Sequence, residues 1–190
     1  MGKCLHIQEL VKLTESVADK DQYTHEHNLS VKNYATKIGN NLRLSKEIIE
    51  NIAFAAILHD IGKVDIPDEI LKKPGKLTEE EFDIIKEHPI IGVEMVKETH
   101  YENLSDIILQ HHERIDGTGY PYGLKGDEIM IEAQVVAMAD VFHAMASDRP
   151  YRKAIDIKDI VEEINGLSGI QYDKKIVDAL MEIIEEDNEI

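Results

Sequence analysis

Ile57-Leu58-His59-Asp60-Ile61-Gly62-Lys63 is the stretch from which the fold and chemistry of this chain can be derived. It closes a run of seven residues, 52–58, that carry no polar side chain. A helical segment that is apolar on every side is normally buried, and a buried His or carboxylate is costly unless something pairs with it. A metal ion pairs with both types. The alternative is a structural pair, in which His59 hydrogen-bonds its neighbour.

Length and composition predict one globular domain, residues 1–190. A chain of 190 residues can bury one full core but is short for two enzymatic domains. With 43% apolar residues, 11 Gly and 5 Pro, it is not expected to be disordered. Strand-like alternation is hard to find, which favours an all-α fold.

Charge, cysteine content and apolar run length indicate where the protein is located and which partners are disfavoured. Against 21 basic residues stand 38 acidic ones, a net charge of −17, which disfavours duplex DNA or RNA and anionic membranes. The single cysteine fits a reducing compartment. No apolar run approaches the roughly 20 residues of a membrane span, and no signal peptide is evident. We therefore expect a cytoplasmic protein.

Apolar periodicity and capping residues predict roughly eight helices. Ser45 is expected to cap one helix, Thr78 and Glu81 to form a capping box, and His88 to cap a helix with Pro89 in its first position. A Gly- and Tyr-rich loop is expected over 113–126. Helical spacing covers residues 6–19, a segment after a break at 20–24, and then 45–59, 103–113, 134–147, 156–165 and 173–186.

Seven His and Asp side chains share one property, because each lies at a predicted helix end or on an apolar helix face. They are His27, His59, Asp60, His88, His111, His112 and Asp140. Distributed over five helices, they converge if the helices form a bundle. Mixed imidazole and carboxylate ligands suit iron, manganese or zinc better than magnesium or calcium. Seven are too many for one tetrahedral site, so we expect two metals that share the carboxylate of Asp60. For His88 alone, simple capping is the alternative.

The motifs give the chain a resemblance to the HD-GYP family, a branch of the HD metal-dependent phosphohydrolases. The resemblance covers about residues 14–180 and indicates a stand-alone HD-GYP domain. The matching stretches are Asp21–His27, His59–Lys63, Ile66–Leu71, Lys73–Thr78, His88, His111–Pro121, Ala139–Phe142 and Ser147–Arg152.

The resemblance implies an HD-type helical bundle with a Gly-Tyr-Pro loop and a cyclic di-GMP phosphodiesterase activity. The product would be pGpG, in some relatives hydrolysed on to GMP, and the attacking group a metal-bridging hydroxide. Two divalent ions, with iron or manganese favoured, would be held by two ligand groups. The groups are His27, His59, Asp60 and Asp140 for one ion, and Asp60, His88, His111 and His112 for the other.

The same resemblance assigns substrate contacts, each with a plainer alternative. Lys63 would lie beside the scissile phosphate, or be a surface lysine. Arg149 and Arg152 would contact the outer phosphate or guanine, or bond the carbonyls of a helix end. Tyr120 could stack on a guanine or donate a hydrogen bond near the metals, or only pack the loop.

Two positions depart from the family pattern. Tyr23 stands where some relatives have a Glu that helps to hold a third metal, which favours two metals here. His143 stands where the family usually has Asp, so the surroundings of Asp140 are expected to differ.

Two other functions are weighed against this one. The first is an HD phosphohydrolase acting on another nucleotide, such as 3′,3′-cyclic GMP-AMP. The second is a module that senses cyclic di-GMP or binds a partner protein without turnover. A stand-alone domain would also take its regulation from a partner protein or from the metal.

Overall fold

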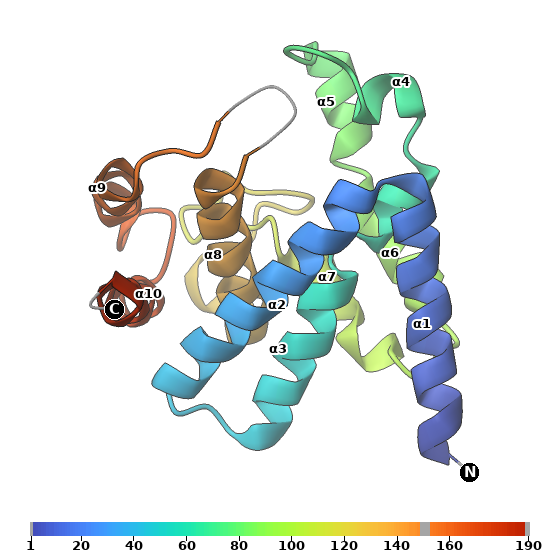
Figure 1. Ribbon diagram of the computed structural model, residues 1–190, viewed down its shortest axis with the longest axis horizontal. Helices are drawn as coiled ribbons and strands as arrows, with labels where there is room; N and C mark the ends of the chain where they lie inside the picture. The colour runs from blue at the N-terminus through green and yellow to red at the C-terminus, as the bar shows by residue number, and fades with distance from the viewer. Residues whose placement is uncertain (1, 149–152, 189–190) are drawn as a thin grey trace.

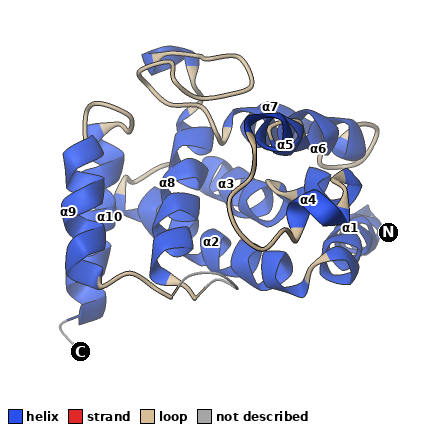
Figure 2. Cartoon of the chain, turned by 90° about the horizontal axis from the view of Figure 1, so that it is seen from above, coloured by secondary structure: helices blue, strands red, loops and turns tan. Residues whose placement is uncertain are grey.

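The computed structural model describes residues 2–148 and 153–188, and over these ranges it consists of helices and loops without a strand (Figures 1 and 2). The predicted all-α class is therefore confirmed. Arg149 and Arg152 lie outside the described residues. In chain order the elements are α1 (Gly2–Lys20), α2 (Gln22–Asn41), α3 (Lys46–Leu58), η1 (Ile61–Asp65), α4 (Asp68–Leu71), α5 (Glu79–Ile85), α6 (His88–Val96), η2 (Glu102–Leu104), α7 (Ser105–Gln110), η3 (Gly126–Glu128), α8 (Ile131–Ala146), α9 (Ile157–Leu167) and α10 (Lys174–Asn188).

Three helices form the centre of the fold, with α2 packed against both α3 and α8 (Figure 1). Their inward faces carry large side chains that are fully buried, among them Ile38, Ile52 and Met138. Removing side chains of this size from water contributes roughly 1.5–3 kcal/mol each. Small buried residues alternate with them and allow close approach of the helix axes: Ala35, Ala55, Ala56, Ala133, Ala137 and Ala139.

The remaining helices surround this centre unevenly. α9 and α10 lie beside α8 at one end of the molecule, and α1 lies at the other end, against α2 and η1 (Figures 1 and 2). α4 and α5 project from the body above η1 and α6 (Figure 1). Over the described residues, the helices are all too short or too polar to cross a membrane.

Local sequence signals account for most helix starts. Ser45 Oγ accepts from the Ile48 N–H at 3.3 Å, and Thr78 and Glu81 form the predicted capping box. Between α1 and α2 the expected five-residue break is a single residue, Asp21, whose carboxylate accepts from the Tyr23 N–H at 3.2 Å. One side-chain cap is enough to restart the helix, because it satisfies a free amide of the first turn.

Two helix predictions are corrected. His88 is the first residue of α6 rather than its cap, and the capping position is taken by Glu87, whose side chain makes no capping bond. The helix expected over 103–113 is divided into η2 and the shorter α7, which ends at Gln110. Apolar spacing identifies the buried face of such a segment, but it does not determine whether each turn is α or 3₁₀.

Candidate metal centre

The fold brings the seven predicted ligands to one place because helix ends and helix faces meet there. His59 and Asp60 follow the last residue of α3, and His88 begins α6. His111 and His112 follow α7. The remaining two lie inside longer helices, His27 in α2 and Asp140 in α8. Each donor therefore comes from a segment that is anchored in the core.

Asp60 lies between two groups of histidines. Its Oδ1 is 3.3 Å from His88 Nε2, and its Oδ2 is 3.4 Å from His59 Nε2. Donor atoms of Asp60, His88, His111 and His112 all lie within 4.8 Å of one another, and so do those of His27, His59 and Asp60. His27 Nε2 is also 2.9 Å from Asp140 Oδ1. The geometry is that of two candidate metal positions which share one carboxylate.

Three of the histidines are held in the same tautomer. The Nδ1 atoms of His59, His88 and His111 lie 2.9, 2.7 and 2.6 Å from the carbonyl oxygens of Ala56, Ile85 and Ile108, each three residues earlier. A carbonyl oxygen can only accept, so Nδ1 carries the proton in each ring. The Nε2 lone pair therefore points into the site, which is the arrangement that metal-binding histidines use.

The donor atoms are arranged as they would be around a cation, and several of them have no hydrogen-bonding partner among themselves. His88 Nε2 and His111 Nε2 face each other at 3.3 Å, although both carry lone pairs in this tautomer. His59 Nε2 and Asp60 Oδ1 are buried without a hydrogen-bond partner. Metal–ligand bonds of about 2.1 Å at right angles put neighbouring ligand atoms about 3 Å apart. The observed separations of 2.9–3.4 Å match such edges.

The electrostatics keep these groups in their metal-binding forms. Burial would raise the pKa of Asp60, but Lys63 and the neighbouring histidines outweigh it and hold that pKa well below its usual value. Burial likewise opposes ionisation of Asp140, yet the bond from His27 and the other histidines lower its pKa. Burial lowers the pKa of His88 to about 4, and it lowers those of His111 and His112 strongly. At neutral pH both carboxylates are therefore ionised, and His88, His111 and His112 are neutral.

Gly62 sets the distance between two of the ligand-bearing segments. A Cβ on this residue would overlap the carbonyl oxygen of His88 and lie 2.7 Å from the backbone nitrogen of Gly92. Only a residue without a side chain lets η1 approach the first turn of α6 this closely. The contact places His88 next to Asp60.

A cavity of about 530 Å³ opens onto the candidate metal centre. Its walls include the candidate ligands His27, Asp60, His88, His112 and Asp140. The described part of its lining also carries four cationic side chains, those of Lys63, Lys72, Lys73 and Arg114. In a chain of net charge −17, this local group of cations favours an anionic occupant.

Lys63 and Tyr120, two predicted substrate residues, both lie in this lining. Lys63 Nζ binds Asp60 Oδ2 at 2.6 Å, so its charge rests on the shared carboxylate. The Tyr120 ring stacks on His112, with centroids 4.6 Å apart and planes 29° apart. Burial, with Asp60 and Asp140 adding to it, raises the pKa of Tyr120, so its hydroxyl stays protonated as a donor. The Tyr120 side chain therefore both packs against His112 and lines the cavity.

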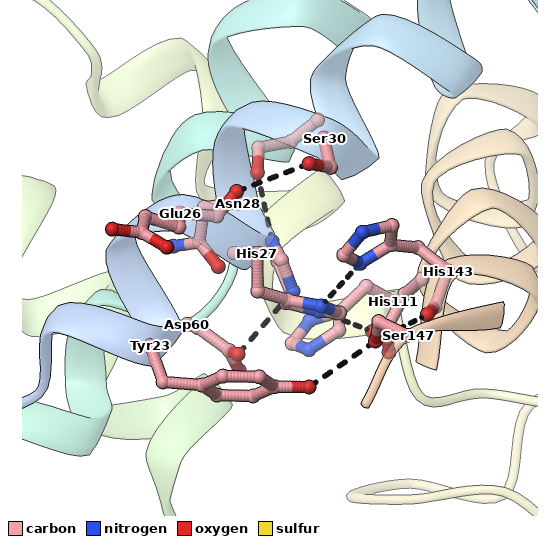
Figure 3. Close-up of polar contacts among 12 residues, drawn as sticks. Tyr23, Glu26, His27, Asn28, Ser30, Asp60, His111, His143 and Ser147 are labelled. Atoms are coloured by element: carbon pink, nitrogen blue, oxygen red, sulfur yellow. Dashed lines mark hydrogen bonds and ion pairs between the residues drawn. The ribbon is translucent and has the colours of Figure 1, made fainter. Parts of the chain in front are cut away.

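Three residues around the site make contacts that were not predicted from the sequence. Buried Glu113 accepts from the Tyr122 and Leu124 N–H groups at 2.8 and 3.0 Å and so holds the 113–126 loop. Asn28 Nδ2 donates to the carbonyl of Ile57 at 3.0 Å and supports the end of α3 before His59. His143 contacts His27 (Figure 3). In the sequence, each of these polar residues lies within three positions of a candidate ligand, and that closeness is the only signal for it. The residue that it contacts cannot be read from the sequence in the same way.

Comparison with known proteins agrees with this geometry. Residues 12–176 match the model of the HD domain family. A cyclic di-GMP phosphodiesterase of Thermotoga maritima is 43% identical over 170 residues, which cover 88% of this chain and 46% of that protein. A 3′3′-cGAMP-specific phosphodiesterase of Vibrio cholerae is 36% identical over 179 residues, covering 92% and 34%. The chain spans about half or less of the length of these curated relatives.

A solved structure extends the agreement to the fold. An HDG"Y"P protein of Bdellovibrio bacteriovorus superposes with a TM-score of 0.70 at 20% identity, covering 85% of this chain and 52% of that one. At this identity the likeness concerns the arrangement of the helices.

Proposed function

The chain belongs to the HD domain family, in its HD-GYP branch, and from this we propose that it is a metal-dependent cyclic di-GMP phosphodiesterase. The observation that carries the proposal is the pair of His/Asp groups sharing Asp60 at the wall of a cavity lined by cations. Phosphohydrolases of the HD domain family are metal-dependent. The proposed product is pGpG, with further hydrolysis to GMP as an extension of the same chemistry.

We propose two divalent metals, with iron or manganese favoured by the ligand chemistry. His27, His59, Asp60 and Asp140 would hold one, and Asp60, His88, His111 and His112 the other. When bound, such ions supply Lewis acidity, which makes water a stronger nucleophile and neutralises charge on phosphoryl oxygens. Tyr23 supports the number two, because its hydroxyl lies 3.3 Å from Ser147 Oγ and is engaged there.

The reaction adds one water across a phosphodiester. A P–O bond forms with the water oxygen, the bond from phosphorus to the 3′-oxygen breaks, and a proton passes to the departing oxygen. Lys63 lines the cavity, and its Nζ would neutralise charge that develops on phosphate oxygens bound there. The neutral rings of His88 and His111 keep their Nε2 lone pairs directed at the site. Tyr120 holds the His112 ring in place by stacking.

The cations along the cavity support an anionic dinucleotide as the substrate. A cyclic dinucleotide carries two phosphates, and Lys72, Lys73 and Arg114 lie in the lining beyond Lys63. Lys73 pairs with Glu81 at 2.6 Å and Lys72 with Asp68 at 2.9 Å. These are surface ion pairs of low energy, so a second phosphate at this wall would take over the two ammonium groups from their carboxylates.

A second candidate substrate is 3′,3′-cyclic GMP-AMP. It is favoured by the 36% identity to the Vibrio cholerae enzyme that is specific for this nucleotide. The two substrates differ in one base and not in their phosphates, so the metal chemistry proposed above would serve either. We also propose a regulatory protein partner and a cytoplasmic location, both of which were expected from the sequence.

The test is anaerobic turnover of cyclic di-GMP with Mn²⁺ or Fe²⁺, for the wild type beside Asp60→Asn and the exposed control Asp19→Asn. We expect pGpG from the wild type and the control, and none from Asp60→Asn. A folded, metal-loaded wild type that releases no product from cyclic di-GMP would overturn the assignment. A parallel series with 3′,3′-cyclic GMP-AMP decides between the two substrates by the ratio of their kcat/KM values.

A further inference from the structure

His27 is oriented in a different way from the other candidate ligands. Its Nδ1 lies 2.8 Å from Nδ1 of His143, a half-buried residue of α8, while its Nε2 faces Asp140 Oδ1 at 2.9 Å (Figure 3). The two ring centroids are 4.9 Å apart. His143 lies three residues after Asp140, so α8 supplies a contact to each nitrogen of the His27 ring.

The position of His27 in its helix explains why it needs this partner. His59, His88 and His111 lie at or next to helix ends and use backbone carbonyl oxygens three residues earlier. His27 lies inside α2, where carbonyl oxygens already accept from amides four residues later. Its Nδ1 therefore has to find an acceptor on another element, and the described structure provides a second imidazole.

The proton between the two rings can be assigned from the role of His27. Two imidazole nitrogens at 2.8 Å share one hydrogen, with one ring as donor and the other as acceptor. If His27 Nε2 is a metal ligand, that nitrogen keeps its lone pair, and the ring proton lies on Nδ1. His143 Nδ1 is then the acceptor, and the proton of the neutral His143 ring lies on Nε2.

The end of α8 is braced against α2 in a way that keeps this pair aligned. Ser147 Oγ donates to the carbonyl of His143 at 2.7 Å. Because the Ser147 hydrogen is used there, the Tyr23 hydroxyl is the donor in its 3.3 Å contact with Ser147 Oγ. Tyr23 lies one turn before His27, so the brace joins the same two helices as the histidine pair.

We propose that His143 is a positioning residue for His27: it fixes the tautomer and orientation of that ligand, and it thereby sets the affinity of the metal position formed with Asp140. The inference rests on the proposed function only in taking His27 to be a metal ligand. Partners of this kind typically contribute 10–100-fold to metal affinity. In the other metal position, His88 and His111 have their own carbonyl partners, so that position does not depend on His143.

The experiment is titration of the metal-free chain with Mn²⁺ by calorimetry, with bound metal counted by elemental analysis and no nucleotide present. We compare wild type, His143→Ala, His143→Asp and His25→Ala, a control on the same helix as His27. His143→Ala is expected to weaken one of two binding events by about 10–100-fold and leave the other unchanged. His143→Asp restores an acceptor and should restore both events, and His25→Ala should match the wild type.

A second measurement detects the tautomer directly. Imidazole ¹⁵N shifts of the wild type loaded with a diamagnetic ion, Zn²⁺, should show His27 protonated at Nδ1 and His143 protonated at Nε2. The proposal is overturned if His143→Ala, folded by circular dichroism, binds two ions with wild-type affinities, if both affinities fall equally, or if the wild type binds fewer than two ions. A wild type that binds two ions and does not cleave cyclic di-GMP would refute the proposed substrate and leave this inference standing.

Discussion

Lys63 Nζ lies 2.6 Å from Asp60 Oδ2, the same oxygen that faces His59 Nε2 at 3.4 Å. A positive charge thus already rests on the carboxylate that we propose is shared by two metals. The Lys63 side chain is 25% exposed and the Asp60 side chain 3%, so the lysine is the partner that can move. Metal binding and the Lys63 ammonium are therefore expected to compete for this oxygen, with the displaced lysine turning into the cavity.

Replacing Lys63 should separate metal affinity from turnover. Lys63→Gln removes the competing charge, so we expect metal to bind several-fold more tightly. The same change removes a cation from the phosphate, and kcat should fall by about 10²-fold, as when one donor to a developing oxyanion is lost. Calorimetry and steady-state kinetics on one preparation measure both effects. Weaker metal binding with unchanged kcat would show that Lys63 only supports the fold.

The buried histidines predict how the stability of the metal-free protein depends on pH. The pKa of His88 is about 4 in the folded chain, against an ordinary value of 6.5. Between these values the unfolded chain binds a proton that the folded chain does not, so the free energy of unfolding decreases as the pH falls from 6.5 to 4. His88 alone accounts for about 3 kcal/mol of this loss. The low pKa values of His111 and His112 act in the same direction.

Urea unfolding in the presence of a chelator, followed by circular dichroism at several pH values, measures this slope. His88→Gln should remove part of it, and His25→Gln should leave it unchanged. Asp60 and Asp140 have lowered pKa values, so their contribution is present above the ordinary carboxylate pKa and is lost only in more acidic solution. A free energy of unfolding that stays constant between pH 6.5 and pH 4 would contradict the histidine burial described above.

The sequence predicts much of this candidate site because several of the candidate ligands lie next to helix caps or on apolar helix faces. His59 and Asp60 end an apolar helix that Ser45 caps, and both are found where that reasoning puts them. His27 and Asp140 follow from the apolar faces of their helices, since a polar residue on such a face needs a partner. The all-α class follows from the same periodicity.

The rest could not be predicted, because it depends on contacts between distant segments. Nothing near His27 in the sequence indicates that its ring meets His143, 116 positions away. The Nδ1 contact of His88 with Ile85 depends on where α6 begins, which the Pro89 signal placed one residue late. Whether Lys63 rests on Asp60 or points into the cavity is a choice between rotamers, and a motif carries no information about it.

Glu113 should control the order of the loop that carries Tyr120. Glu113→Ala removes the carboxylate that accepts from the Tyr122 and Leu124 amides, and the loss of two hydrogen bonds to a charged group should lower the free energy of unfolding by about 2–4 kcal/mol. Tyr120 should then lose its fixed stacking on His112, and kcat should fall. Hydrogen exchange at the two amides reports the loop directly. Glu128→Ala is the matched control, because Glu128 accepts one bond from Lys125 at the exposed end of the same loop. Wild-type exchange rates in Glu113→Ala would contradict this role.

Gly62 should be required for the metal position that contains His88. In Gly62→Ala the new methyl group would overlap the His88 carbonyl oxygen, so η1 and α6 must separate and the 3.3 Å distance between Asp60 Oδ1 and His88 Nε2 must grow. Overpacking of this kind costs about 1–3 kcal/mol. We expect lower stability and the loss of one of two Mn²⁺ binding events. Gly166→Ala is the control, since a Cβ there meets no atom within 4 Å and an alanine in the last turn of α9 should not lower the stability. If Gly62→Ala kept both binding events, the spacing of η1 and α6 would not determine the position of His88.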